Sequence, residues 1–190
     1  MIKIAILGHG VVGTGTARMI EDNAKCIEKL VGDAVEVKYI LDIRDFSAHE
    51  EASLFTKDFD DLLNDDEISI VVETMGGIRF AYDYTKALLE SGKSVVTSNK
   101  ELVAAKGCEL LKVADENNVN FLFEASVGGG IPIIRPISQC LAANDIDEIA
   151  GILNGTTNFI LTKMIEDGMQ FADALKLAQD LGFAERNPAA

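Results

Sequence analysis

Hydrophobic residues in the first two thirds of the chain gather in short runs, which are separated by longer segments of mixed polarity. The first run, Ile2–Leu7, is almost wholly apolar, and a similar run recurs at Ile68–Glu73. Short continuous apolar runs are typical of strands in a parallel sheet, because both faces of such a sheet are buried. The strands predicted in this way are Ile2–Leu7, Val35–Leu41, Ile68–Glu73, Ser94–Val96 and Asn120–Glu124.

Between these runs the apolar residues recur at helical spacing, as at Val12, Met19, Ile20 and Ile27. An acidic, loop-prone stretch extends from residue 42 to residue 66. The helices predicted are Val11–Leu30, Phe59–Asn64, Ala81–Glu90 and Leu102–Glu116. Alternation of strands with helices predicts an α/β fold, a doubly wound parallel sheet of the Rossmann-like kind.

A glycine-rich turn, G-H-G-V-V-G, connects the first predicted strand to the first predicted helix. Glycine permits a tight turn and a close approach of the backbone to a pyrophosphate, and the helix start offers N–H groups to an anion. In this strand–turn–helix context the motif indicates a dinucleotide-binding site. The candidate cofactor residues here are Gly8, Gly10, Val11, Val12 and Gly13.

The end of the second predicted strand carries two charged candidates, Asp42 and Arg44. An acidic residue at this place hydrogen-bonds the ribose of NAD, whereas an arginine pairs with the 2′-phosphate of NADP. The pair favours NADP without excluding NAD. In the alternative interpretation both residues are solvated loop charges.

Small and polar residues follow the later strands, at the edge where an open α/β sheet binds its ligands. They are Glu73-Thr74-Met75, Thr97-Ser98-Asn99-Lys100 and Glu124-Ala125-Ser126. Lys100 is a candidate to meet a carbonyl group or a nicotinamide. The alternative is a lysine at a helix start, a place that the helix dipole disfavours.

The pattern changes after Glu124, where a glycine-rich segment leads to Pro132. Beyond it the sequence predicts a helix over Ile133–Leu141, a strand over Ile146–Leu153 and two further helices. We therefore predict a nucleotide-binding domain over residues 1–130 and the start of an α+β substrate and dimerisation domain over residues 131–190. A domain of about 60 residues has a marginal core, so we expect the chain to be cut short.

Composition narrows the classes of partner. Seventeen Lys and Arg against 31 Asp and Glu give a net charge of −14, which disfavours nucleic acid and anionic membranes as partners. No apolar run approaches the roughly 20 residues that span a bilayer. Three widely spaced cysteines, Cys26, Cys108 and Cys140, form no metal or redox motif and suggest the reducing cytoplasm.

Several motifs together resemble homoserine dehydrogenase, and the resemblance runs through essentially the whole chain. The family reduces L-aspartate 4-semialdehyde to L-homoserine with NADPH or NADH, on the route to threonine and methionine. The motifs are the glycine turn, V-E-T-M-G-G from Val72, V-T-S-N-K-E from Val96, F-E-A-S-V-G-G-G-I-P from Phe123, G-I-L-N-G-T-T-N-F-I-L from Gly151 and G-F-A-E from Gly182.

The resemblance implies roles for individual residues. Thr74, Met75 and Ser98 would line the nicotinamide side, and Lys100 would lie at the junction of cofactor and substrate. Glu185, with Gly155 and Thr156, would bind the small-molecule substrate. A monovalent cation such as sodium would be held by Glu124 and the main-chain carbonyls of Val127, Gly129 and Ile131; the alternative for Glu124 is a capping or hinge carboxylate.

In the family, the proposed proton donor is a lysine that follows the glutamate-x-acid-proline segment. The chain ends at Ala190, before such a lysine, so we expect its activity to be impaired, with Lys100 as a second candidate proton source. The segment reads Glu185-Arg186-Asn187-Pro188, where the family commonly has aspartate before the proline. The full-length protein is expected to form a homodimer. The alternative function is a regulatory module that senses NAD(P)H without turnover.

Overall fold

A computed structural model of the chain describes residues 1–184. Six parallel strands form one sheet in the order β3-β2-β1-β4-β5-β6. The order reverses direction at β1, which is the switch point of a doubly wound sheet and the usual place for a ligand crevice. The strands are β1 (Ile2–Leu7), β2 (Val35–Leu41), β3 (Phe55–Thr56), β4 (Ile68–Glu73), β5 (Ser94–Thr97) and β6 (Phe121–Leu122).

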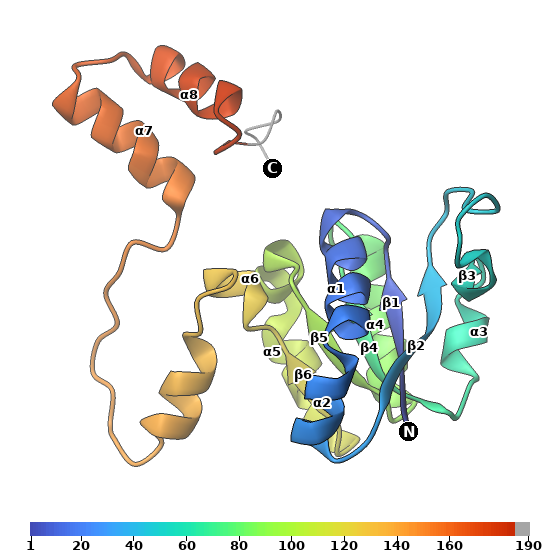
Figure 1. The fold of residues 1–190 in the computed structure, drawn as a ribbon. Helices are drawn as coiled ribbons and strands as arrows, with labels where there is room; N and C mark the ends of the chain where they lie inside the picture. The colour runs from blue at the N-terminus through green and yellow to red at the C-terminus, as the bar shows by residue number, and fades with distance from the viewer. Residues whose placement is uncertain (185–190) are drawn as a thin grey trace. The chain divides into compact units, whose positions relative to one another are not determined.

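Helices connect the strands by crossovers, and Figure 1 shows α1 in front of the sheet and α4 behind it. The ring of Phe59, just before α3, stacks on Tyr84 of α4 at 4.0 Å between centroids, which places α3 beside α4. The helices of this part are α1 (Val11–Asp22), α2 (Ala24–Val31), the short 3-10 turn η1 (Ala52–Leu54), α3 (Asp60–Leu63), α4 (Arg79–Glu90), α5 (Lys100–Glu116) and α6 (Ala125–Gly128).

The core lies between the sheet and these helices. Strand residues such as Ala5, Leu7 and Val71 are wholly buried, and helix residues such as Leu88 and Leu110 pack against them. Burial of this apolar surface is the main stabilising term, at about 25 cal/mol per Å². The Rossmann-like α/β fold predicted from the pattern is confirmed.

Several details differ from the sequence prediction. The helix predicted from Val11 to Leu30 is broken at Asn23, whose side chain donates to the carbonyl of Met19 and so competes with the helical backbone. The short strand β3 was not predicted within its acidic surroundings. The helix predicted over 133–141 contains a π-helical segment, η2 (Pro136–Cys140), in which Leu141 N–H donates to the carbonyl of Pro136, five residues earlier.

The described chain divides into two compact units, one over Met1–Ala142 and one that begins at Ala143. In the second unit α7 (Gly155–Glu166) and α8 (Phe171–Asp180) pack as a helical pair through Ile160, Ala174 and Ala178. The domain limits 1–130 and 131–190 stay a prediction.

The strand predicted over Ile146–Leu153 is wrong for the described structure, where this segment is irregular. Its apolar residues Ile146, Ile149, Ile152 and Leu153 are exposed. A strand needs a hydrogen-bonded neighbour, and the residues that the structure describes provide none for this segment. An apolar pattern alone is therefore not enough to predict a strand over residues 146–153.

Candidate functional site

The parallel register sets the ends of four strands level at one edge of the sheet. Leu7 lies opposite both Leu41 and Glu73, and Glu73 lies opposite Thr97. Backbone hydrogen bonds continue past the strand ends, from Gly8 N to Leu41 O at 2.8 Å and from Thr74 N to Leu7 O at 2.9 Å. The predicted site residues that follow β1, β2, β4 and β5 therefore begin side by side.

The glycine turn is closed tightly between β1 and α1. Gly8 has φ +92°, a conformation that favours glycine, and a Cβ on Gly13 would lie 2.0 Å from the carbonyl oxygen of Gly8. The N-cap residue Gly10 has no capping side chain, so the first N–H groups of α1 are left for an anion. The side chains of Val11 and Val12 are exposed beside this helix start.

Asp42 and Arg44 are organised around this turn. Asp42 accepts hydrogen bonds from His9 N at 2.8 Å and from Arg44 N at 3.0 Å, and its carboxylate pairs with the Arg44 guanidinium at 2.8 Å. Arg44 also donates to the carbonyl of His9 at 2.7 Å. The Asp42 side chain is only 8% exposed, so it is not a solvated loop charge.

The hydrogen bonds of Asp42 also fix its charge. The side chain of Arg44, and then the backbone N–H groups of Arg44 and His9, hold the pKa of Asp42 well below its usual range, against the opposing effect of burial. Asp42 is therefore an anion that Arg44 already neutralises. The bonds from the Arg44 guanidinium to Asp42 and His9 use Nε and Nη2, so the two N–H groups of Nη1 are available to a further acceptor.

We expect the Asp42→Asn variant to lower the free energy of unfolding by about 1.5–3 kcal/mol near neutral pH, because charged hydrogen bonds are lost. The depressed pKa of Asp42 contributes stability that is complete above the unfolded value of about 3.9 and is lost progressively as the pH falls from that value toward the lower pKa of the folded state. Urea unfolding at about pH 7 and about pH 3 should show the gap between variant and parent shrinking at the acidic pH.

Asp83→Asn, which removes an exposed carboxylate on α4, is the matched control for net charge. A gap for Asp42→Asn that stays constant between the two pH values would contradict the role assigned to the Asp42 anion.

An aromatic cluster that the sequence did not predict supports the same turn. The ring of His9 meets Phe46, His49 and Phe55 edge to face, with centroids 5.1, 5.6 and 4.9 Å away. Burial, and then the nearby His49 and Arg44, lower the pKa of His9. His9 is therefore a packing residue of the turn, and the cluster attaches the β2–β3 connection to it.

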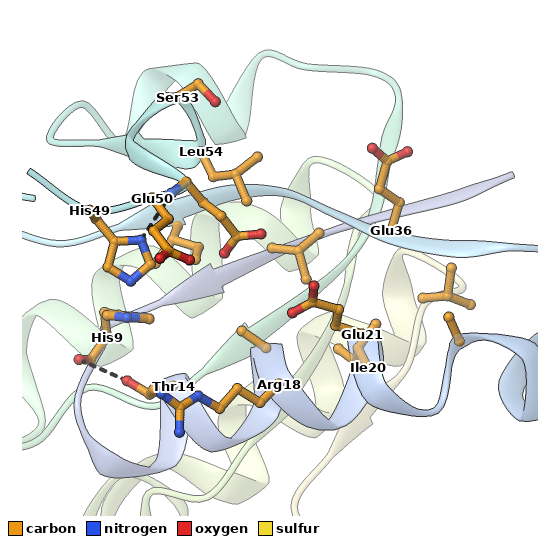
Figure 2. Close-up of a pocket in the computed structure, with 16 residues that line it drawn as sticks. His9, Thr14, Arg18, Ile20, Glu21, Glu36, His49, Glu50, Ser53 and Leu54 are labelled. Atoms are coloured by element: carbon orange, nitrogen blue, oxygen red, sulfur yellow. Dashed lines mark hydrogen bonds between the residues drawn. The ribbon is translucent and has the colours of Figure 1, made fainter. Parts of the chain in front are cut away.

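Two hollows adjoin the glycine turn. One, of about 560 Å³, is lined by the turn itself together with Arg18 and Arg44, which suits a phosphate group. The other, of about 710 Å³, runs between α1 and β2 (Figure 2), and its charged lining includes Glu21, Glu36, Glu50 and Glu51, which disfavour an anion. Arg18 was missed from the sequence, although it lies one helical turn after Thr14 on the same face of α1.

The loops after β4 and β5 carry the other predicted cofactor residues. Thr74 donates its hydroxyl toward the carbonyls of Leu7 and Gly8, each at 2.9 Å, so this loop is attached to the glycine turn. Ser98 N approaches Glu73 O at 3.4 Å. Lys100 is exposed and is the first residue of α5, directly after the N-cap Asn99, whose side chain accepts from Leu102 N. Its role stays a prediction.

Glu124 has a capping arrangement. Its carboxylate accepts N–H groups from Ile133, Ile134 and Arg135, the middle one at 2.8 Å, and the N–H groups of Ile133 and Arg135 lead in lowering the pKa of Glu124. This is the alternative that the sequence left open for this residue. Val127, Gly129 and Ile131 lie on the same glycine-rich segment.

The predicted substrate residues lie in the second unit, which is described by itself. Gly155 and Thr156 begin α7, where Asn154 caps the helix by accepting from Thr157 N at 2.9 Å. The Thr156 hydroxyl donates to the carbonyl of Phe183. Glu185 lies outside the described residues.

Comparison with known proteins identifies the family. A family model described as the NAD binding domain of homoserine dehydrogenase matches residues 8–124. The chain belongs to the homoserine dehydrogenase family. A second model, described as homoserine dehydrogenase, matches residues 132–190.

Relatives in the homoserine dehydrogenase family are similar over nearly the whole chain. The homoserine dehydrogenase of Bacillus subtilis is 42% identical over 98% of this chain and 44% of its own length. The crystal structure of a homoserine dehydrogenase from Thiobacillus denitrificans superposes with a TM-score of 0.89 at 42% identity, over 98% of this chain and 44% of that chain. This chain thus spans less than half of the length of these relatives.

A hyperthermophilic archaeal homoserine dehydrogenase in complex with NADPH is also similar, with a TM-score of 0.84 at 30% identity, over 99% of this chain and 63% of that chain. The matched NAD-binding domain begins at Gly8, the first residue of the glycine turn.

Two further features of the described residues concern membrane-spanning helices and cysteines. No helix in residues 1–184 is both long and apolar enough to cross a membrane. Cys26, Cys108 and Cys140 are free thiols at exposed positions.

Proposed function

We propose that the chain supplies the nicotinamide-nucleotide site, and the beginning of the substrate site, of a homoserine dehydrogenase. The proposed reaction reduces L-aspartate 4-semialdehyde to L-homoserine. The observation that carries the proposal is the closed glycine turn, where Gly13 leaves no room for a side chain and the start of α1 faces Arg44. This cradle fits a pyrophosphate, and a side chain at Gly13 would collide with the backbone of Gly8 that shapes it.

The bound nicotinamide would supply the hydride that reduces the aldehyde carbon. The residues of this chain would bind and orient the reactants. The helix start after Gly10 would hold the pyrophosphate, and the loops that carry Thr74, Met75 and Ser98 would lie along the nicotinamide. Lys100, exposed at the start of α5, would stabilise or protonate the oxygen of the aldehyde as it gains negative charge.

We infer that NADP is preferred over NAD. Asp42 is already satisfied by His9 and Arg44, so it is a poor acceptor for a ribose hydroxyl. Arg44 offers further N–H groups close to Arg18, and two guanidinium groups at one hollow are suited to a 2′-phosphate. The relative solved with NADPH supports the same choice.

A monovalent cation is proposed at Glu124 with the carbonyls of Val127, Gly129 and Ile131. A hard cation takes oxygen ligands of this kind. The fit is partial, because three backbone N–H groups already use most of the roughly four lone-pair directions of the Glu124 carboxylate. Substrate binding through Gly155, Thr156 and Glu185, a homodimer of the full-length protein and a cytoplasmic location are further proposals.

The first test is a fluorescence titration of the chain with NADPH and with NADH. We expect saturable binding of both nucleotides, with NADPH the tighter. A longer chain, extended to the length of the relatives, should then consume NADPH only when L-aspartate 4-semialdehyde is added. Nucleotide binding without such turnover in the longer chain would reject the dehydrogenase proposal in favour of a nucleotide-sensing module.

A further inference from the structure

Glu73 is a wholly buried carboxylic acid at the end of a central strand. It is the last residue of β4, with Leu7 of β1 on one side and Thr97 of β5 on the other. Burial raises the pKa of Glu73, against the hydrogen bonds that it accepts. An acidic group at this place is unfavourable unless hydrogen bonds compensate for its lost solvation.

The hydrogen bonds of Glu73 join two loops of the candidate site. One carboxylate oxygen accepts from Met75 N at 2.8 Å, in the loop after β4. The other accepts from the hydroxyl of Thr97 at the end of β5. That hydroxyl in turn accepts from Asn99 N at 2.9 Å, so the carboxylate is connected to the start of α5.

Asn99 extends this connection in both directions. Its side-chain oxygen accepts from Leu102 N at 3.1 Å and caps α5, the helix that begins with Lys100. Its side-chain nitrogen donates to Gly77 O at 2.7 Å, back in the loop after β4. Glu73, Thr97 and Asn99 thus form a closed network between the loop that carries Met75 and the helix start that carries Lys100.

We propose that Glu73 is a positioning residue for the nicotinamide half of the bound dinucleotide. The inference rests on the proposed function, which places Met75 and Lys100 beside the nicotinamide and the aldehyde. Glu73 acts through other residues, because it is buried and its oxygens are directed to Met75 and Thr97. It sets the separation between the two loops before any ligand binds.

The adenosine half of the nucleotide is held by a different set of contacts. Asp42 and Arg44 are fixed by bonds to each other and to His9, and none of these bonds includes Glu73, Thr97 or Asn99. Loss of the Glu73 network should therefore weaken binding of a ligand only if that ligand reaches the loops after β4 and β5. This locality separates a positioning role from a general contribution to stability.

The test compares the affinities of NADPH and of adenosine 2′,5′-bisphosphate, which lacks the nicotinamide half. Glu73→Leu keeps a similar volume but accepts no hydrogen bond. We expect its NADPH affinity to fall about tenfold, the effect of one charged hydrogen bond, while its affinity for the bisphosphate stays unchanged. Glu73→Gln should recover most of the NADPH affinity, because its amide accepts from Met75 N and donates to Thr97.

Thr97→Val removes the hydroxyl that donates to Glu73 and should lower the affinity for NADPH while leaving the affinity for the bisphosphate unchanged. This variant replaces Glu73→Leu in the test if Glu73→Leu does not fold. The matched control is Thr85→Val, because Thr85 is a buried threonine on α4 whose hydroxyl has no partner among the described residues. The control should bind both ligands like the parent. Thermal unfolding of every variant establishes that the compared proteins are folded.

Equal weakening of both ligands, or of neither, in Glu73→Leu and Thr97→Val would overturn the positioning role and leave the proposed function intact. Binding of neither ligand by the parent chain would overturn the proposed function, and the inference with it.

Discussion

Replacement of Gly13 by alanine is expected to lower the affinity for NADPH by about 100-fold. The new Cβ would lie 2.0 Å from the carbonyl oxygen of Gly8 and 2.8 Å from the hydroxyl of Thr74. The first contact is with backbone, which cannot rotate away, so α1 must move from β1 and the anion cradle opens. A shift of about 1 Å at such a site costs about 100-fold in function, and overpacking costs about 1–3 kcal/mol of stability. Fluorescence titration with NADPH measures the first effect, and urea unfolding measures the second.

Gly107→Ala is the matched control, because Gly107 lies within α5, lines neither hollow, and a Cβ there would meet only the side chain of Val103, at 3.3 Å. Alanine at this position should leave NADPH binding unchanged. Retention of NADPH affinity by a folded Gly13→Ala variant would show that the turn does not hold the nucleotide.

The second large effect is expected from Arg44→Ala, which should reverse the preference between the two nucleotides. NADPH should lose about 100-fold in affinity, because charge-assisted hydrogen bonds to its 2′-phosphate disappear and the Asp42 carboxylate is left uncompensated beside it. NADH should bind at least as well as before, since the same carboxylate becomes available to the ribose hydroxyls. Titration of the variant with both nucleotides measures the reversal.

Lys112→Ala removes the same unit of charge from the exposed surface of α5 and controls for the overall electrostatic field. Equal losses of NADPH and NADH affinity in Arg44→Ala would assign Arg44 to the turn as a whole and remove the argument for NADP.

The parts of the fold that were predictable are those in which local pattern and tertiary environment agree. Central strands such as Ile2–Leu7 and Ile68–Glu73 are apolar because the sheet buries both faces, so composition alone identified them. Asn23 breaks the predicted helix through the hydrogen bond that its side chain donates to the carbonyl of Met19. The apolar residues on both sides of it keep helical spacing, so the spacing alone could not predict the break. Residues 146–153 have the composition of a strand, but hydrogen bonding in a sheet depends on a second segment.

Only part of the candidate site, likewise, could be predicted from the sequence. The glycine turn and the residues just after the strands follow from motif and topology, since parallel strands end at one edge. The cluster of His9 with Phe46, His49 and Phe55 depends on contacts between residues about 40 positions apart, which no local window contains. Glu73 was visible at a strand end, but its burial and its bonds to Met75 and Thr97 emerged only with the structure.

The level alignment of Leu7, Glu73 and Thr97 has a consequence for changes in chain length. Side chains alternate between the two faces of a strand, so one residue inserted within β4 would turn the Glu73 carboxylate to the opposite face and separate it from Met75 and Thr97. The turn at Gly92, between α4 and β5, carries no such constraint, because the preceding helix end can adjust. Insertions and deletions should therefore be tolerated where helices lead into strands. Inside a central strand they should not be tolerated, because they would turn the residues at the strand end away from the candidate site.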